Sequence, residues 1–207
     1  MPHRFAEIMF TDSVKAVQDH YHTRTHNQRF EQLGGPNMAL TRQEVGFIEA
    51  RDGFYMATVT ETGWPYVQFR GGPRGFIKAL DENTLGYADF RGNLQYISMG
   101  NLSGNDRVAL FFMDYRNRVR LKLLGHVRVE DAALNPELAA TLEVPGYRGQ
   151  VERAVRITVA AFDWNCPRHI TPKFAEDEVA RVVEPMRVRI AELEAALARI
   201  SAPAIQT

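Results

Sequence analysis

The sequence predicts a mainly β protein of the α+β class, in which an antiparallel barrel carries flanking helices and a C-terminal helix. Two observations predict this fold. Short segments rich in aromatic and β-branched residues recur at regular spacing between residues 54 and 162, with turn residues between them. From residue 179 onward, apolar residues instead recur every three or four positions, which is typical of a helix.

Seven segments have the composition of β-strands. Residues 54–60 are followed by the turn sequence Glu61-Thr62-Gly63, and residues 64–69 read as the returning strand of a hairpin. The other candidate strands are residues 75–80, 84–90, 107–115, 118–130 and 152–162. Their short, regular spacing favours an antiparallel barrel over a parallel α/β sheet.

Helices are expected before the first strand and between later strands. Residues 11–33 begin with three capping residues and end before a Gly-Gly-Pro sequence. A second helix is expected to start at Thr41, because Glu44 follows at the spacing of a capping box. Shorter helices are expected at residues 93–102 and near residues 138–142.

The C-terminal segment contains a heptad pattern. Its apolar positions, spaced alternately by four and three residues, are Val179, Val183, Met186, Ile190, Leu193, Leu197 and Ile200. This is an a/d seam of about three heptads. Pro185 either kinks the helix or marks its first turn. Both an amphipathic helix on its own barrel and an intersubunit coiled coil fit the pattern. The expected organisation is an N-terminal helical arm (1–40), a barrel domain (41–172) and a C-terminal helix (173–207).

Composition and charge exclude several classes of protein. The 207 residues include 25 basic and 25 acidic side chains, so zero net charge gives no general attraction to nucleic acid or an anionic membrane. No apolar run approaches 18 residues, so no membrane span is expected. A single cysteine, Cys166, and a start unlike a secretory signal lead us to expect a cytoplasmic protein. His22 and His26 lack an evident third ligand, so no metal site is expected.

The first candidate binding segment is the Gly-rich turn at residues 70–75. Its glycines let backbone N–H groups approach an anion, and Arg70, Arg74 and Lys78 place three cations within nine residues. The segment matches neither the Walker nor the Rossmann fingerprint. A solvated Gly/Pro turn fits these residue types as well.

Basic and apolar residues alternate strictly at residues 118–123. With the two-residue period of a strand, Arg118, Arg120 and Lys122 share one face, and the apolar residues between them face the core. The basic face is either a cationic wall toward a phosphate or flavin, or a solvated outer surface.

A strand end, a polar loop and a helix start follow one another at residues 87–96. Backbone N–H groups at such a helix start can hold a phosphate, with help from Arg91. Simple capping of the helix by Asn93 is the alternative.

Residues 162–172 combine Trp164, Cys166 and His169 with two prolines, which indicates a pocket wall. A Cys166 nucleophile with His169 as base is one interpretation. No third group orients this pair, and a lone cysteine is more often an inert small apolar residue. The sequence therefore identifies no catalytic residue.

Residues 47–130 resemble the pyridoxamine 5′-phosphate oxidase-like superfamily of FMN-binding split barrels. The resemblance rests on stretches in the family's order and spacing, at residues 54–59, 63–67, 75–78, 85–89 and 105–112. It implies an antiparallel six-stranded split β-barrel, and a homodimer with two flavin sites at the subunit interface. Residues 163–172 resemble an uncharacterised bacterial branch of this superfamily.

The resemblance also implies which residues bind FMN. Arg74 and Lys78 match positions that contact the phosphate and ring edge in the family, with Arg70 as an alternative. Arg120 matches a polar position that reaches the isoalloxazine ring, and Trp164 a late tryptophan beside it. The family's Ser-Arg-Lys phosphate loop is absent, and Arg91-Gly92-Asn93 stands in its place. The full set of matched cofactor-binding positions is Arg70, Arg74, Ile77, Lys78, Tyr87, Ala88, Asp89, Arg91, Asn93, Gln95, Arg120 and Trp164.

Departures from the family's oxidase bear on the expected activity. The oxidase grips its pyridoxal substrate with an Arg-x-His pair, but here Arg168 and His169 are adjacent, so vitamin B6 oxidation is not expected. The resemblance implies an FMN-dependent oxidoreductase acting on a small-molecule substrate or electron donor, with Arg120 stabilising the reduced flavin. The alternative is a non-catalytic flavin or haem carrier or sensor, since the superfamily includes haem-handling and deazaflavin-using members.

Overall fold

The computed structural model describes residues 1–165 and 167–201, and it contains two compact units. The first unit comprises residues 1–114 and 119–168 and contains the sheet with helices α1 to α6. The second unit comprises residues 115–118 and the chain from His169 onward, including α7 (Glu176–Ser201). The proposed Cys166 nucleophile lies outside the described residues. None of the described helices combines the length and apolar character needed to cross a bilayer.

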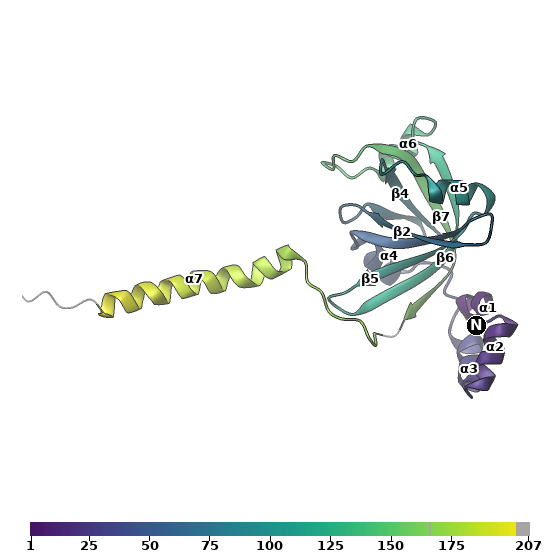
Figure 1. The fold of residues 1–207 in the computed structure, drawn as a ribbon, viewed down its shortest axis with the longest axis horizontal. Helices are drawn as coiled ribbons and strands as arrows, with labels where there is room; N and C mark the ends of the chain where they lie inside the picture. The colour runs from purple at the N-terminus through teal and green to yellow at the C-terminus, as the bar shows by residue number, and fades with distance from the viewer. Residues whose placement is uncertain (166, 202–207) are drawn as a thin grey trace, which may run out of the picture. The chain divides into compact units, whose positions relative to one another are not determined.

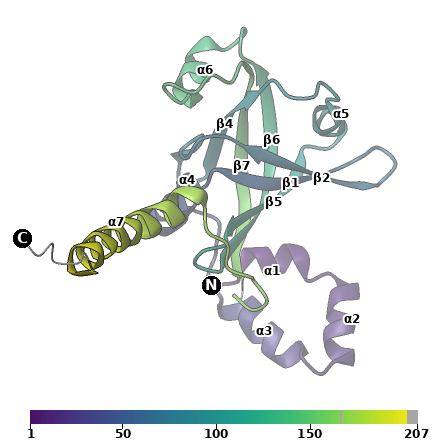
Figure 2. The same cartoon turned by 60° about the vertical axis from the view of Figure 1, so that its left-hand side comes forward.

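One antiparallel sheet curls around a shared interior in the first unit (Figure 1, Figure 2). Its strands are β1 (Gly53–Val59), β2 (Pro65–Gly71), β3 (Ile77–Asp81), β4 (Thr84–Phe90), β5 (Arg107–Asp114), β6 (Val119–Asp131) and β7 (Val151–Asn165). They pair in the order β2-β1-β5-β6-β7-β4-β3, and each pair is antiparallel. The antiparallel sheet expected from the strand spacing is therefore confirmed.

The sheet differs from the implied six-stranded barrel in strand number and closure. It has seven strands in the described part of the chain, and its edge strands β2 and β3 do not pair with each other. The residues that join them, 72–76, bond elsewhere: Gly72 N–H donates to the Asp52 carbonyl and Gly75 N–H to the Glu49 carbonyl. Pro73 has no N–H with which to extend a ladder. The sheet is consequently open along this edge.

Aromatic and aliphatic side chains fill the interior of the curled sheet. The Phe54 ring lies 5.4 Å from Tyr87 and 5.1 Å from Phe112, measured between centroids. Leu121 and Leu123 of β6 are fully buried, which confirms the side of this strand that alternation predicted for the core. Burial of each such side chain contributes about 1.5–3 kcal/mol.

Three helices precede the barrel: α1 (Arg4–Met9), α2 (Asp12–His20) and α3 (Arg24–Leu33). The prediction of one helix over residues 11–33 is wrong because the chain leaves helical geometry between α2 and α3. His22 has a φ of 56°, and the Thr23 hydroxyl donates to the Gln18 carbonyl. Such a local side-chain bond competes with continuation of the helix.

Helix α4 (Arg42–Glu49) begins with the predicted capping box, formed by Thr41 and Glu44. The Thr41 N–H donates to Glu44 Oε2 at 2.9 Å, and the Trp164 indole N–H donates to Oε1 at 2.7 Å. Burial alone would raise the pKa of Glu44, but these hydrogen bonds outweigh burial and lower it below its ordinary value. Glu44 therefore joins α4 to β7 as a buried carboxylate.

The remaining helices are α5 (Ile97–Gly104), α6 (Pro136–Leu142) and α7. The predicted C-terminal helix is confirmed, and Pro185 lies inside it rather than in its first turn. Within the second unit, Arg116 Nη1 lies 2.7 Å from Glu178 Oε1, and Lys173 lies over the Tyr115 ring.

We expect Glu44→Gln to reduce the free energy of unfolding by about 1.5–3 kcal/mol at pH 7, because the hydrogen bonds lose a charged acceptor. The lowered pKa means that Glu44 stabilises the fold above its ordinary pKa and loses this effect as pH falls through the folded-state value. The difference from wild type should therefore shrink below about pH 4. Urea denaturation monitored by circular dichroism measures both quantities.

Glu61→Gln is the matched control, since Glu61 is exposed in the turn between β1 and β2. A Glu44→Gln deficit that stays constant across this pH range would contradict the assigned role of the charge.

Candidate functional site

A buried carboxylate joins three strands at the candidate site. Asp89, on β4, is only 2% exposed and lies between Arg70 of β2 and Arg153 of β7. Arg70 Nη1 donates to Asp89 Oδ1 at 2.8 Å, and Arg153 Nε and Nη2 donate to Oδ2 at 2.9 and 2.7 Å. Such charge-assisted bonds are stronger than bonds between neutral groups.

The pairing of the strands explains this arrangement. Asp89 and Arg153 are direct cross-strand partners in the β4–β7 ladder, beside a register shift between Asp89 and Phe90. Opposite charges at such positions attract across the two strands. Arg70 instead belongs to an edge strand at the far end of the strand order. Its bond to Asp89 therefore connects this edge strand to β4, the strand next to the opposite edge strand β3.

The cluster keeps an excess of positive charge. Arg91 Nε lies 3.8 Å from Glu152 Oε1, and Arg153 Nη2 lies 2.9 Å from Glu152 Oε2. Three guanidinium groups, including that of Arg70, thus face two carboxylates. The buried Nε of Arg70 has no hydrogen-bond partner among the described residues. Glu152 Oε2, although close to Arg153 Nη2, is likewise buried without a hydrogen-bond partner in the described part of the chain. Guanidinium groups that are not fully paired favour an anion.

Burial acts in opposite directions on the pKa values of Arg153 and Tyr87. Burial alone would lower the pKa of Arg153, but the bonds and charge of Asp89, with the charge of Glu152, outweigh it and raise the pKa. Arg153 therefore stays charged. Burial raises the pKa of the Tyr87 phenol, whose hydroxyl lies 3.9 Å from Met56 Sδ, so Tyr87 is a neutral core residue.

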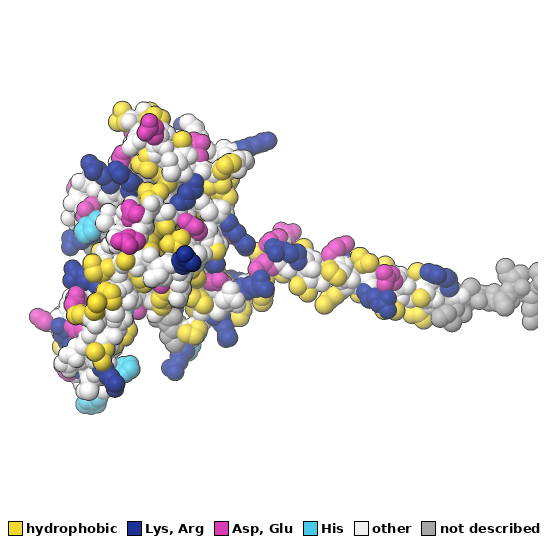
Figure 3. Space-filling view, turned by 180° about the vertical axis from the view of Figure 1, so that it is seen from behind, with side chains coloured by type: hydrophobic (Ala, Val, Ile, Leu, Met, Phe, Trp, Pro, Cys, Tyr) yellow, Lys and Arg dark blue, Asp and Glu magenta, His cyan; other side chains and the backbone are white. Residues whose placement is uncertain are grey.

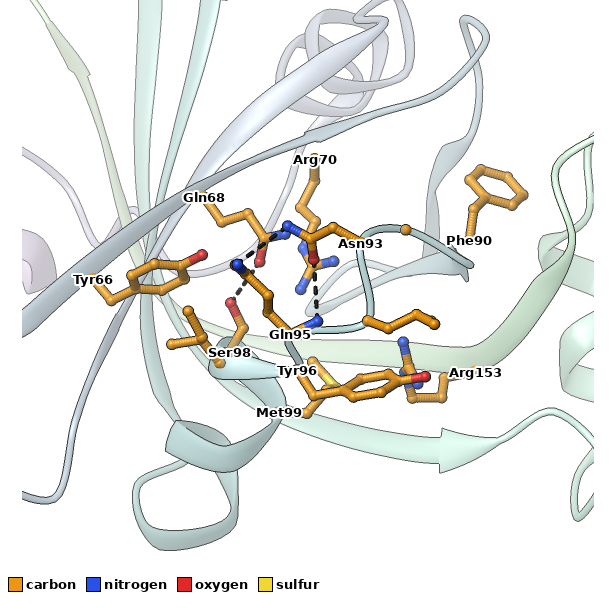
Figure 4. Close-up of a pocket in the computed structure, with 13 residues that line it drawn as sticks. Tyr66, Gln68, Arg70, Phe90, Asn93, Gln95, Tyr96, Ser98, Met99 and Arg153 are labelled. Carbon is orange, nitrogen blue, oxygen red and sulfur yellow. Dashed lines mark hydrogen bonds between the residues drawn. The ribbon is translucent and has the colours of Figure 1, made fainter.

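A small pocket of about 40 Å³ adjoins the arginines. Figure 4 shows Arg70, Asn93 and Gln95 on one side of it and Tyr96 beside Arg153 on another. Its lining residues are Tyr66, Gln68, Arg70, Phe90, Gly92, Asn93, Leu94, Gln95, Tyr96, Ile97, Ser98, Met99 and Arg153. Two larger hollows, of about 370 and 270 Å³, share some of these residues and therefore adjoin it.

The first turn of α5 forms part of the pocket wall. The residue before this helix, Tyr96, has a φ of 52° and provides no side-chain cap. The N–H groups of that turn therefore lack a capping side chain, and such groups favour an anion. The prediction that the helix starts at residue 93 is wrong, because Asn93 Oδ1 accepts a bond from the Gln95 N–H in the loop before it.

The structure brings several predicted residues together. Those lining this pocket or the hollow of about 270 Å³ are Arg70, Tyr87, Ala88, Asp89, Arg91, Asn93 and Gln95. Arg70 comes from β2. The placement of the others follows from the end of β4 and the loop after it, which the sequence identified as a continuous segment.

Three predicted residues near the Gly-rich turn lie elsewhere. Lys78 Nζ donates to the carbonyls of Thr141 and Glu143 at the end of α6, at 2.6 and 2.9 Å. Ile77 is fully buried in the core, and Arg74 is exposed on the turn. None of the three lines the pocket or its adjoining hollows.

Arg120 and Trp164 also lie outside these hollows. The Trp164 indole donates to Glu44 and packs edge-on against Phe47, 4.8 Å between centroids. Arg120 lies on β6, and its buried Nε has no partner among the described residues. Its neighbour on the same face, Lys122, pairs with Asp163 at 2.8 Å.

Sequence reasoning missed Arg153 and the polar residues of β2, Tyr66 and Gln68. Arg153 stands at the start of a predicted strand, and nothing local indicates that this strand pairs with β4. Gln68 Oε1 accepts a bond from the Ser98 hydroxyl at 2.9 Å, a contact between segments 30 residues apart. No cluster of three His, Cys, Asp or Glu side chains suited to a metal occurs among the described residues.

We expect Asp89→Asn to reduce the free energy of unfolding by about 3–5 kcal/mol, because it leaves two largely buried guanidinium groups without their counter-charge. Urea denaturation measures the loss. Asp106→Asn is the control, since Asp106 forms an exposed pair with His126 and should change stability by less than about 1 kcal/mol. Equal effects of the two substitutions would contradict a structural role for the buried carboxylate.

Comparisons with known proteins agree with this fold. Searched against curated proteins, the chain finds no match. Among solved structures, it is similar to HupZ from Group A Streptococcus, with a TM-score of 0.50 and 16% identity over 65% of this chain and 99% of that chain. A putative pyridoxamine 5′-phosphate oxidase from Lactobacillus delbrueckii gives a TM-score of 0.47 and 19% identity, over 60% and 93% of the two chains.

An FMN-binding protein from Syntrophomonas wolfei gives a TM-score of 0.44 and 9% identity, over 74% and 97% of the two chains. A family model described as pyridoxamine 5′-phosphate oxidase matches residues 40–162, which span every strand from β1 to β6 and most of β7. Because this match covers more than half of the chain, the chain belongs to the pyridoxamine 5′-phosphate oxidase family.

Proposed function

We propose that this chain binds FMN and acts as a flavin-dependent oxidoreductase, with the FMN phosphate held by Arg70, Arg153 and the first turn of α5. One observation carries the proposal. A largely buried cluster of two arginines and two carboxylates, with the half-exposed Arg91 as a third cation beside it, adjoins an uncapped helix N-terminus. Within this cluster, Arg70 Nε has no hydrogen-bond partner among the described residues. Guanidinium groups and helix N-termini both favour phosphate oxygens.

The sizes of the pocket and the hollow suit two different parts of FMN, the phosphate and the ring system. The pocket of about 40 Å³ suits an anionic head group rather than a whole flavin, since ligand pockets usually measure about 300–1,000 Å³. The adjoining hollow of about 270 Å³ has aromatic walls from Phe69, Phe90 and Tyr147, which suit a planar ring system. The phosphate would thus occupy the charged pocket and the rings the hollow beside it.

Bound FMN supplies hydride or electron transfer, and the protein binds, orients and tunes it. In this chain Arg70 and Arg153 provide positive charge, and Asp89 fixes both guanidinium groups in place. Asn93 and Gln95 hold each other in the loop that closes one side of the pocket. We assign no acid or base at this site.

We also propose that two copies pair through the outer face of β1, β2 and β5. Tyr55 of β1 stands between Phe69 of β2 and Phe111 of β5 in the register, and Val67 is the β2 partner of Ala57. Phe69 and Val67 are 56% and 59% exposed. A contiguous exposed apolar face of this kind marks an interaction surface.

The residues of β2 connect this face to the proposed cofactor site. Tyr66, Gln68 and Arg70 line the pocket, and Val67 and Phe69 between them are more exposed. Phe69 also borders the adjoining hollow of about 270 Å³. A second copy seated on β2 would therefore lie beside the flavin. This supports the homodimer with shared flavin sites that the family resemblance implies.

We expect Arg70→Gln to weaken FMN binding by roughly tenfold to a hundredfold while leaving riboflavin binding nearly unchanged, because only FMN has the phosphate. Quenching of flavin fluorescence measures both affinities on the same protein, so riboflavin is an internal control for folding. Arg74→Gln is the matched control, because the exposed Arg74 should leave both affinities unchanged.

Equal weakening of FMN and riboflavin by Arg70→Gln would contradict the phosphate assignment.

Wild-type protein loaded with FMN tests the reaction class, since NADH or NADPH should reduce the flavin and an added acceptor should reoxidise it. FMN retained without such turnover would favour the carrier. A Soret band on haem addition without flavin retention would favour the haem alternative, although no histidine lines the described hollows.

We expect Phe69→Asp to convert the dimer to monomer in analytical ultracentrifugation at micromolar concentration, because it places a charge in the centre of the proposed interface. Thr62→Asp, in the exposed turn after β1, is the control and should leave the dimer intact. A dimer that persists in the Phe69→Asp protein would show that the copies pair through another surface.

A further inference from the structure

Helix α7 carries an exposed apolar seam. Val179, Met186, Ile190, Leu193 and Leu197 are each 47–62% exposed, and Figure 3 shows apolar side chains along the length of the helix. An isolated helix is only marginally stable in water, and helices in proteins gain most of their stability by packing an apolar face against a partner. Over about three heptads the seam is roughly 33 Å long, at 1.5 Å per residue. It therefore needs a partner of similar length.

The residue types of the seam favour a second helix of the same kind. Its a positions hold Val183, Ile190 and Leu197, and its described d positions include Met186 and Leu193. Val183 and Ile190 at a, with Leu193 at d, match the β-branched and leucine residues that favour a parallel, two-stranded coiled coil. From residue 186 onward the seam is also narrow, because Arg187 and Glu194 occupy flanking e positions and Arg189 a g position. A helix packed on a globular core normally has a wider apolar stripe.

The flanking charges are complementary in one arrangement. In a parallel, in-register pair, a g residue faces the e residue five positions later on the other helix. Arg189 would therefore face Glu194 of the second copy, and the symmetry would form this pair twice. Within one copy, Arg189 contacts Glu192 at 2.8 Å, and Glu194 has no ion-pair partner among the described residues.

Pro185 does not interrupt the seam. It lies inside the continuous helix, and its heptad position is c, on the outer side. Its missing N–H removes one bond to the carbonyl of Arg181. The apolar positions on either side, Val183 and Met186, keep their register.

We infer that α7 pairs with α7 of a second copy as a parallel, in-register, two-stranded coiled coil. The observations behind this inference, and its test, do not require FMN to bind. The partner of the seam is then a second copy of this chain. The ion pair between Arg189 and Glu194 would set the parallel orientation of the two helices.

The test uses disulfide trapping in the full chain with a Cys166→Ser background. Leu193→Cys places two thiols at the same d layer, within the Cα separation of 4.4–6.8 Å that a disulfide spans. We expect rapid formation of a covalent dimer under mild oxidation, measured on a non-reducing gel. Ala195→Cys is the control, because this position faces outward and should react at least about tenfold more slowly.

The charges are tested through the same reaction. Adding Glu194→Arg to the Leu193→Cys protein should slow trapping by roughly threefold, because Arg189 would then face a like charge. Adding Arg189→Glu as well should restore the rate. Equal trapping at positions 193 and 195, or no trapping at either, would overturn the pairing. An unchanged rate in the Glu194→Arg protein would overturn the parallel register.

Discussion

The buried contact of Asp89 with two arginines holds the open sheet together at the point where its hydrogen-bonded ladder fails. β2 and β3 do not pair, so main-chain bonds leave the two ends of the strand order unconnected. Arg70 extends from the edge strand β2 to Asp89 on β4, next to the other edge strand, and Arg153 of β7 binds the same carboxylate. Burying these charged side chains costs desolvation free energy. We therefore interpret the cluster as a means of holding β2 and β4 in a fixed geometry.

That geometry is the basis of the proposed phosphate site. Asp89 binds the Nε–Nη2 edge of Arg153 and one Nη1–H of Arg70, which fixes the orientation of both guanidinium groups. Arg70 Nε remains without a hydrogen-bond partner among the described residues. Preorganised donors lose little freedom when they bind an anion. The same interaction therefore links β2 to β4 across the open edge of the sheet and orients the donors of the proposed phosphate site. Stability and the proposed cofactor affinity would then depend on one carboxylate.

The strands, the capping box of α4 and the buried side of β6 could be predicted because local pattern determines them. The break between α2 and α3 could not be predicted, because the apolar spacing within residues 11–33 is typical of a helix. The break depends on the positive φ of His22 and on the hydrogen bond from the Thr23 hydroxyl. Predicted site residues on one continuous segment, such as Asp89 and Asn93, lie together at the pocket and its adjoining hollow, because the chain itself keeps them close. Lys78 and Trp164 were matched to the site by resemblance, but the end of α6 and Glu44 hold them elsewhere.

The outer face of β1, β2 and β5 and the apolar seam of α7 are both proposed to bind a second copy of this chain. Pairing through one surface favours pairing through the other. Three heptads form a short coiled coil, which is marginal when two free chains must meet. If the outer face of β1 and β2 already joins two copies, the helices meet at the high effective concentration set by the connecting residues. The same linkage works in reverse, because paired helices keep two sheets close enough to complete two cofactor sites. The C-terminal seam would then stabilise flavin binding without any residue of α7 touching the flavin.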